Sequence, residues 1–138
     1  MTSTVVDTNV FIDLLGPETE QRRWSLSALQ ASSEQGRLIL SPIVWAELAA
    51  SPLSERQLID SLSWLNVLRE QFSFAAAVLA GREHRAYRRA GGARERTLPD
   101  FLIGAQACAG GHLLLTRDAA RYRSYFPSLD IISPETHP

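Results

Sequence analysis

The sequence predicts an α/β domain in which helices flank a central, mainly parallel, twisted sheet. Short runs of β-branched and aliphatic residues recur along the chain and are typical of strands. Stretches of helical character separate these runs, and several begin at a capping residue or end at glycine or proline. Strands that alternate with helices favour parallel pairing, because each helix carries the chain back to the same end of the sheet.

The expected elements follow one another without a repeat, a low-complexity segment or a domain linker. Strands are expected over residues 4–6, 37–40, 64–68, 112–116 and 129–132. Helices are expected over residues 10–15, 18–35, 41–51, 53–63, 72–90, 97–110 and 118–126. Ser41 and Pro42 give the clearest helix start, an N-cap residue followed by proline at the first helical position.

Length and composition limit the class of protein. The 138 residues fit one domain, which we take as residues 1–138. Cys108 is the only cysteine and the chain starts without a secretion-signal pattern, so a reducing, cytoplasmic setting is expected. No apolar run approaches the ~20 residues that span a bilayer, so no membrane association is expected. With a net charge of −1, any attraction to nucleic acid must be local or carried by a metal.

Three acidic residues stand at the ends of expected strands or at the start of an expected helix. Asp7 directly follows the first strand, Asp118 lies just beyond the fourth, and Asp100 opens the helix over residues 97–110. Sites in open α/β sheets form at the carboxyl ends of strands, so Asp7 and Asp118 are expected to share one crevice. Taken alone, each acid is more typical of an N-cap that satisfies free backbone N–H groups.

Two of the acids fall in apolar surroundings. Residues 101–109 are apolar nearly all round, so their helix is expected to be buried, with Asp100 at the boundary of the core. Glu47 falls on a stripe of apolar and small residues, so its carboxylate is expected to be buried. A buried carboxylate needs a cation, which is either one of the many arginines or a metal ion.

The four acids together predict a metal site. Carboxylates gathered in one pocket repel one another and take up protons unless a cation intervenes. Mg²⁺ or Mn²⁺ is the expected ion, because hard oxygen ligands suit hard cations. The three histidines are scattered and Cys108 stands alone, so the sequence has no zinc-binding pattern.

The order of these acids resembles the pattern of PIN-domain nucleases. The segments that carry the resemblance are VVDTN at residues 5–9, VWAEL at 44–48, LPDFLIGA at 98–105 and LTRD at 115–118. They place Asp7, Glu47, Asp100 and Asp118 as the four acids of the family. The similarity extends from residue 5 to about residue 132, and the order, spacing and length resemble VapC-type toxins of bacterial toxin–antitoxin pairs. Gly104 departs from the alanine that many relatives carry.

The resemblance implies a PIN-like fold and a Mg²⁺- or Mn²⁺-dependent endoribonuclease, a hydrolase that acts as the toxin of such a pair. It implies a homodimer, an RNA substrate such as tRNA or ribosomal RNA, and a cognate antitoxin protein. The four acids are assigned as catalytic. Asp7, Asp100 and Asp118 are assigned as metal ligands, with Asp7 and Asp100 the first candidates for direct contact and Glu47 completing the set.

Three polar residues beside the acids are further candidates. Asn9 and Thr116 have short side chains and are expected to orient the metal-binding acids. The alternatives are a local backbone contact for Asn9 and a plain strand position for Thr116. Arg117 is expected to contact substrate or, equally, to form a salt bridge with a site acid.

Other charged residues are expected to be solvated. Arginines are dense over residues 82–96, at positions 82, 85, 88, 89, 94 and 96. We interpret them as a solvated helix face interleaved with acids, with phosphate contact as the alternative. Residues 91–96 are expected to form a mobile loop, and Asp13 is expected to face solvent.

Two rival functions remain open at this point. An aspartate-based phosphotransfer enzyme also has an aspartate after its first strand, but this chain has no lysine and carries Asn9 at the position of a second aspartate. A non-catalytic RNA- or protein-binding module of the same fold would use the acids structurally. The intact set of four acids argues against that module.

Overall fold

The structure, a computed structural model, describes residues 2–92 and 97–138. Its strands are β1 (Thr2–Val6), β2 (Gly36–Leu40), β3 (Val67–Arg69), β4 (Leu113–Leu115) and β5 (Ile131–Ile132). Its helices are α1 (Thr8–Leu15), α2 (Glu20–Gln35), α3 (Pro42–Ala49), α4 (Glu55–Leu62), α5 (Phe74–Arg89), α6 (Leu98–Gly110) and α7 (Ala120–Arg123). Each expected element is present, with ends shifted by a few residues. None of these helices has both the length and the apolar character needed to cross a bilayer.

The five strands form one sheet in the order β3-β2-β1-β4-β5, and every pairing is parallel. The predicted parallel α/β fold is therefore confirmed. Strand β1 lies at the centre, where Thr4 is in register with Leu38 of β2 and with Leu113 of β4. Because the strands are parallel, the segments that follow β1, β2 and β4 all start from the same end of the sheet.

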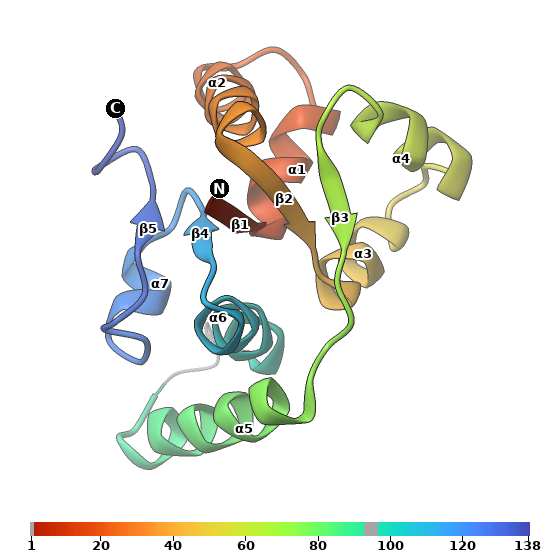
Figure 1. The fold of residues 1–138 in the computed structure, drawn as a ribbon. Coiled ribbons are helices and arrows are strands. Elements are labelled where there is room, and N and C mark those ends of the chain that lie inside the picture. Colours follow the sequence, from red (N-terminus) through yellow and green to blue (C-terminus); the bar gives the residue numbers. More distant parts are fainter. Residues whose placement is uncertain (1, 93–96) are drawn as a thin grey trace.

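Helices cover both faces of this sheet. Figure 1 shows α1 and α2 on one side of the central strands and α6 on the other, with α5 outside α6. The central strands are buried on both faces, so they are continuous apolar runs rather than alternating ones. Val5, Val6, Leu38 and Leu114 are fully buried, and Ile39 is nearly so. Burial of these side chains drives the packing of the layers.

Helix α6 is buried as expected, and one glycine sets how closely α7 approaches it. A Cβ atom at Gly104 would lie 2.6 Å from the ring of Phe126 and 3.1 Å from the ring of Tyr122. Both rings are buried. The absent side chain therefore makes room for the aromatic residues of α7 and the segment after it, and it sets where Tyr122 lies.

A polar cluster ties the connection after β3 to α6, β4 and β1. Gln106 donates to a carboxylate oxygen of Glu70 at 3.1 Å, and the same carboxylate lies 2.9 Å from Nε2 of His112. Nδ1 of His112 lies 2.5 Å from the hydroxyl of Ser3. These contacts satisfy polar groups that would otherwise be costly to bury beside the core, although Oε1 of Gln106 has no hydrogen-bond partner among the residues that the structure describes. The chain between β3 and α5 is thereby fastened to the sheet.

We expect Gly104→Ala to lower the free energy of unfolding by about 1–3 kcal/mol, because the new methyl group overpacks the rings of α7. Gly81→Ala is the matched control, since a Cβ there meets no atom within 4 Å on the exposed face of α5. That change should add about 0.4–1 kcal/mol by restricting the unfolded chain. Urea unfolding of both variants measures the difference. Equal stability of the two variants would contradict the close packing at Gly104.

Candidate active site

Asp7 is the buried centre of the candidate site. It follows β1, caps the N-terminus of α1, and is only 3% exposed. Its Oδ1 accepts a hydrogen bond from the backbone N–H of Thr8 at 2.8 Å. Its Oδ2 accepts from the hydroxyls of Thr116 and Tyr122, both at 2.8 Å, and from the amide of Asn9 at 3.4 Å. Donors from α1, from the residue after β4 and from α7 thus meet on a single carboxylate.

Burial sets the acidity of this carboxylate. The loss of water raises the pKa of Asp7 above its ordinary value of 3.8, and the charge of Asp100 acts in the same direction. The hydrogen bonds from Tyr122 and Thr116 and the charge of Arg121 lower the pKa but do not cancel the effect of burial. Burial, together with the adjacent Asp7, also holds the pKa of Tyr122 well above its usual range, so its hydroxyl remains a donor.

Asp100 and Asp118 are bridged by one arginine of α7. Nη1 of Arg121 lies 3.2 Å from Asp100, and its Nε lies 3.1 Å from Asp118. Burial alone would lower the pKa of Arg121, but the charges of Asp100 and Asp118 outweigh it and raise the pKa. The two acids come from the start of α6 and from the segment after β4, so Arg121 joins two separate elements.

Glu47 is exposed, so the expectation of a buried carboxylate at this position is wrong. Helix α3 buries Val44 and Leu48, and Glu47 lies on the flank of that stripe. The small residues that follow Glu47, Ala49 and Ala50, are themselves exposed, so they do not indicate a buried face of the helix. Glu47 still reaches the site, because its Oε1 accepts a hydrogen bond from the Thr8 hydroxyl at 2.6 Å. Thr8 thus contacts Asp7 through its backbone and Glu47 through its side chain.

Asn9 and Thr116 both contact Asp7 directly. Thr116 is fully buried, and its hydroxyl also accepts a hydrogen bond from the backbone N–H of Asp118 at 3.0 Å. The amide of Asn9 lies 3.4 Å from the Thr116 hydroxyl, and its oxygen accepts from the backbone N–H of Arg117 at 3.3 Å. These contacts span the ends of β1 and β4, so both side chains can orient the acids around them.

Arg117 points its charge at Asp13 rather than at one of the four acids. Its guanidinium forms a bidentate pair with the Asp13 carboxylate, one contact through Nε and one through Nη2 at 3.1 Å. Asp13 also accepts from the Ser25 hydroxyl at 2.6 Å and its side chain is only 10% exposed. The expectation that Asp13 faces solvent is therefore wrong, and Arg117 fastens the segment after β4 to α1.

The described arginines of the basic segment lie on α5. The side chains at positions 82, 85, 88 and 89 are exposed, which agrees with a solvated helix face. Arg94 and Arg96, and residues 93–96 of the expected mobile loop, lie outside the described residues.

The carboxylate oxygens of the site are ligands that suit a divalent cation, but the acids are too far apart to bind one without rearrangement. In the described part of the chain, no three acidic, histidine or cysteine side chains lie close enough together to hold an ion as they stand. Arg121 lies between Asp100 and Asp118, where a cation would otherwise be needed. The guanidinium contacts the carboxylates of Asp100 and Asp118, and the carboxylate of Asp7 lies near enough for its charge to act on Arg121. These three acids carry more negative charge than one arginine supplies, so the site suits a further hard cation.

Comparison with known proteins decides the family. The PIN-domain family profile matches residues 4–126, which is most of the chain. The chain belongs to the PIN-domain family. No curated protein sequence gives a significant match.

Solved structures agree with this fold over the whole PIN domain. The VapBC2 complex of Rickettsia felis bound to promoter DNA has a TM-score of 0.72 at 18% identity, covering 96% of this chain and 98% of that one. FitAcB from Neisseria gonorrhoeae has a TM-score of 0.67 at 21% identity, covering 98% and 99%. A toxin–antitoxin complex from Klebsiella pneumoniae has a TM-score of 0.67 at 25% identity, covering 95% and 97%.

Three residues of this PIN domain join the site although the sequence analysis did not select them. Arg121 follows Asp118 by three residues, a spacing that brings side chains together on a helix, so its pairing could have been found. Tyr122 shares an apolar stripe with Phe126, and nothing in the sequence indicates that its hydroxyl reaches Asp7. Thr8 lies in the VVDTN segment directly after Asp7, but its link to Glu47 depends on how α1 and α3 pack.

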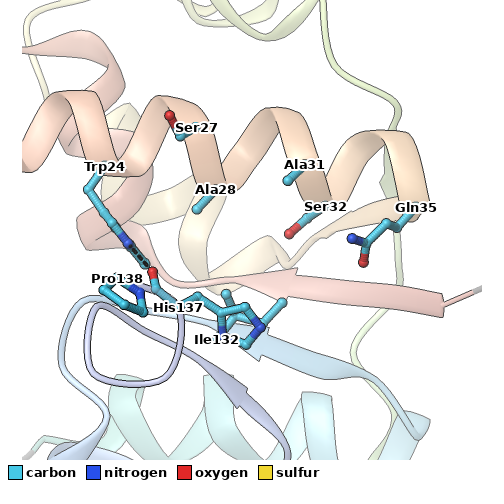
Figure 2. A pocket seen from close by; sticks show the side chains of 9 residues that line it. All are labelled: Trp24, Ser27, Ala28, Ala31, Ser32, Gln35, Ile132, His137 and Pro138. Atoms are coloured by element: carbon cyan, nitrogen blue, oxygen red, sulfur yellow. Dashed lines mark hydrogen bonds between the residues drawn. The ribbon is translucent and has the colours of Figure 1, made fainter.

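A separate hollow in the PIN domain shares no lining residue with the acids. Figure 2 shows it between α2 and the C-terminal segment, with a volume of about 220 Å³. Its lining residues are Trp24, Ser27, Ala28, Ala31, Ser32, Gln35, Ile132, His137 and Pro138. The indole N–H of Trp24 donates to the carbonyl of His137 at 2.7 Å, which holds the C-terminal segment against α2. None of the lining side chains is a carboxylate, so they do not suit a hard cation.

The raised pKa of Asp7 leads to a prediction about stability. Because the folded state holds the Asp7 proton more tightly than the unfolded chain, ionised Asp7 lowers the stability of the metal-free PIN domain at neutral pH. Asp7→Asn cannot ionise and keeps an oxygen for the N–H of Thr8, and the hydroxyls of Thr116 and Tyr122 can turn to accept from the new amide N–H groups. We expect metal-free Asp7→Asn to be more stable than wild type at pH 7.

This advantage should shrink as the pH falls through the raised pKa, and it should vanish below the ordinary value of 3.8. Urea unfolding in the presence of chelator, between about pH 3.5 and pH 8, would measure this difference in stability, because that range covers both the ordinary and the raised pKa of Asp7. A variant less stable than wild type at pH 7, or a pH-independent difference, would contradict the dominance of burial at Asp7.

Proposed function

We propose that this PIN domain is a divalent-metal-dependent endoribonuclease that hydrolyses RNA phosphodiester bonds and acts as the toxin of a toxin–antitoxin pair. The observation that carries the proposal is the meeting of Asp7, Glu47, Asp100 and Asp118 in one network at the carboxyl end of the sheet. So many carboxylates around one buried aspartate are unfavourable without added positive charge. Membership of the PIN family supports the proposal that these carboxylates serve a nuclease reaction.

Mg²⁺ or Mn²⁺ is the proposed cofactor, held by Asp7, Asp100 and Asp118 with Glu47 completing the set. When bound, such an ion would activate a water molecule and stabilise the negative charge that grows on the leaving oxygen. The residues of the chain prepare this binding. Tyr122 and Thr116 fix the orientation of Asp7 through two hydrogen bonds of 2.8 Å. Asn9 links the same carboxylate to the segment that carries Asp118.

The proposed partners follow from the neighbours in structure. Those neighbours are described as VapBC, FitAB and toxin–antitoxin complexes, and three of them are described as bound to DNA. We therefore propose a cognate antitoxin protein as a partner, a homodimer as the working form, and RNA, such as tRNA or ribosomal RNA, as the substrate. The cytoplasmic setting expected from the sequence remains a prediction.

The rival phosphotransfer reaction is disfavoured by the surroundings of Asp7. A phosphorylated aspartate must offer an oxygen to the incoming phosphoryl group. Asp7 is almost completely buried, and the sequence contains no lysine that could steady a phosphoryl group there. A dianionic phosphoryl group would also be placed among carboxylates.

Metal-dependent cleavage of RNA tests the proposal directly. With Mn²⁺, the purified protein should cut a mixed pool of structured RNAs, and a chelator should abolish the cutting. Asp7→Asn and Asp100→Asn should each lower the rate by more than about 100-fold, since even residues that only orient metal ligands contribute about 10–100-fold. Thr116→Val, which removes a donor to Asp7, should fall within that smaller range.

Asp60→Asn is the matched control for these variants. Asp60 lies on α4 with 68% of its side chain exposed, so the same chemical change there should leave cleavage unchanged. Circular dichroism would verify that every variant is folded. Full activity of folded Asp100→Asn would contradict the assignment of that residue, and intact RNA under all metals tested would favour the non-catalytic module.

The toxin role has its own test in living cells. Expression of the wild-type chain in a bacterial host should arrest growth, because uncontrolled cleavage of RNA stops translation. Asp7→Asn should relieve the arrest, and so should co-expression of the antitoxin encoded beside the toxin. Unimpaired growth with abundant, active, uncomplexed wild-type protein would contradict the toxin role and leave the nuclease assignment intact.

A further inference from the structure

We propose that Arg121 is a built-in counter-ion that holds the active site in a metal-free state and must leave Asp100 and Asp118 before a divalent ion binds. The inference deepens the proposed function and rests on the metal site assigned there. In this proposal, Arg121 competes with the metal ion for the carboxylates of the site. The guanidinium and the metal would alternate on the same carboxylates.

The first support is where the guanidinium lies. Its two contacts of 3.2 Å and 3.1 Å join Asp100 and Asp118, which are separate in the sequence and lie on different elements. The positive charge of Arg121 also acts on the buried carboxylate of Asp7. The guanidinium therefore interacts with all three acids proposed as metal ligands, as an ion at that place would.

The second support is that the metal geometry is missing while this contact is made. Among the described residues, no three potential ligands are close enough to hold an ion. A guanidinium and a divalent cation that share the carboxylates of Asp100 and Asp118 repel each other, so the two positive charges compete for these acids. We therefore expect a bound metal ion to displace the guanidinium.

The third support is that the side chain of Arg121 is partly exposed, whereas that of its neighbour is fully buried. Its side chain is 35% exposed and extends from α7, a helix of four residues without a side-chain cap. Partly exposed ion pairs are screened by water and are weak. Tyr122, the next residue, is fully buried and bonded to Asp7. Helix α7 thus combines one fixed residue, which orients the buried acid, with one movable residue, which neutralises the outer acids.

The consequence is a lower apparent affinity for metal than the acids alone would give. An ion that binds only the released state has its affinity reduced by the fraction of molecules in that state. The contacts of Arg121 also keep Asp100 and Asp118 together when no ion is bound. A protein whose activity must be restrained would gain from a site that stays closed at low metal concentration.

Titration calorimetry of the metal-free protein with Mn²⁺ tests the proposal. Arg121→Gln should bind Mn²⁺ about tenfold more tightly than wild type, because two weak ion pairs no longer compete. Arg123→Gln is the matched control, since it removes an equal charge from an exposed position on the same helix. Its affinity should stay within about twofold of wild type if general charge effects are screened by salt.

The same variants should differ in stability. Metal-free Arg121→Gln should unfold at a lower temperature than Arg123→Gln, because Asp100 and Asp118 lose their counter-ion. Saturating Mn²⁺ should raise the unfolding temperature of Arg121→Gln by more than it raises that of wild type. Equal or weaker Mn²⁺ affinity in Arg121→Gln would overturn the proposal and make Arg121 a fixed part of the site.

A measurement on the wild-type protein keeps the proposal testable if Arg121→Gln fails to fold. The Nε–H signal of Arg121 in a ¹H–¹⁵N spectrum should be protected from solvent exchange without metal and should shift and lose protection as Mg²⁺ is added. An unchanged signal at saturating Mg²⁺ would overturn the proposal.

Asp7→Asn separates this inference from the proposed function. Loss of Mn²⁺ binding in Asp7→Asn, with equal binding by wild type and Arg121→Gln, would refute the part given to Arg121 and leave the metal site standing. Absence of Mn²⁺ binding in wild type and Arg121→Gln alike would refute both. Tighter binding by Arg121→Gln together with its loss in Asp7→Asn supports both.

Discussion

The buried carboxylate of Asp7 is the constraint on which the rest of the site depends. It lies at the end of the central strand, almost without access to water, where a negative charge is costly unless donors and cations surround it. The backbone of Thr8 and the hydroxyls of Thr116 and Tyr122 supply the donors. These groups come from α1, from the residue after β4 and from α7, so one carboxylate fixes how three segments meet.

Packing far from Asp7 serves the same purpose. Tyr122 can donate to Asp7 because Gly104 of α6 leaves room for the aromatic rings beside it. Asp13 and Arg117 pair beneath the site and hold the segment that carries Asp118 against α1. Asp100, Asp118 and Glu47 are all more exposed than Asp7. The fold thus places the most buried acid at the centre and the more exposed acids around it.

The sequence predicts most of the fold because local patterns and layer packing agree. Apolar runs, the cap at Ser41 and the glycines at the end of α6 locate the elements, and their alternation predicts the parallel sheet. The four acids could be selected because three of them stand at strand ends or a helix start. The prediction that Glu47 is buried is wrong, because a stripe of small residues on a helix does not by itself indicate a buried face. The parts of Arg121 and Tyr122 depend on tertiary contacts that no local pattern contains.

The central claim is that these acids gather around a divalent ion, and anomalous diffraction from crystals grown with Mn²⁺ tests it most directly. The account predicts an anomalous peak in contact with the carboxylates of Asp7 and Asp100, with Asp118 beside it and the guanidinium of Arg121 turned away. Mn²⁺ bound elsewhere, with Arg121 still bridging Asp100 and Asp118, would contradict it.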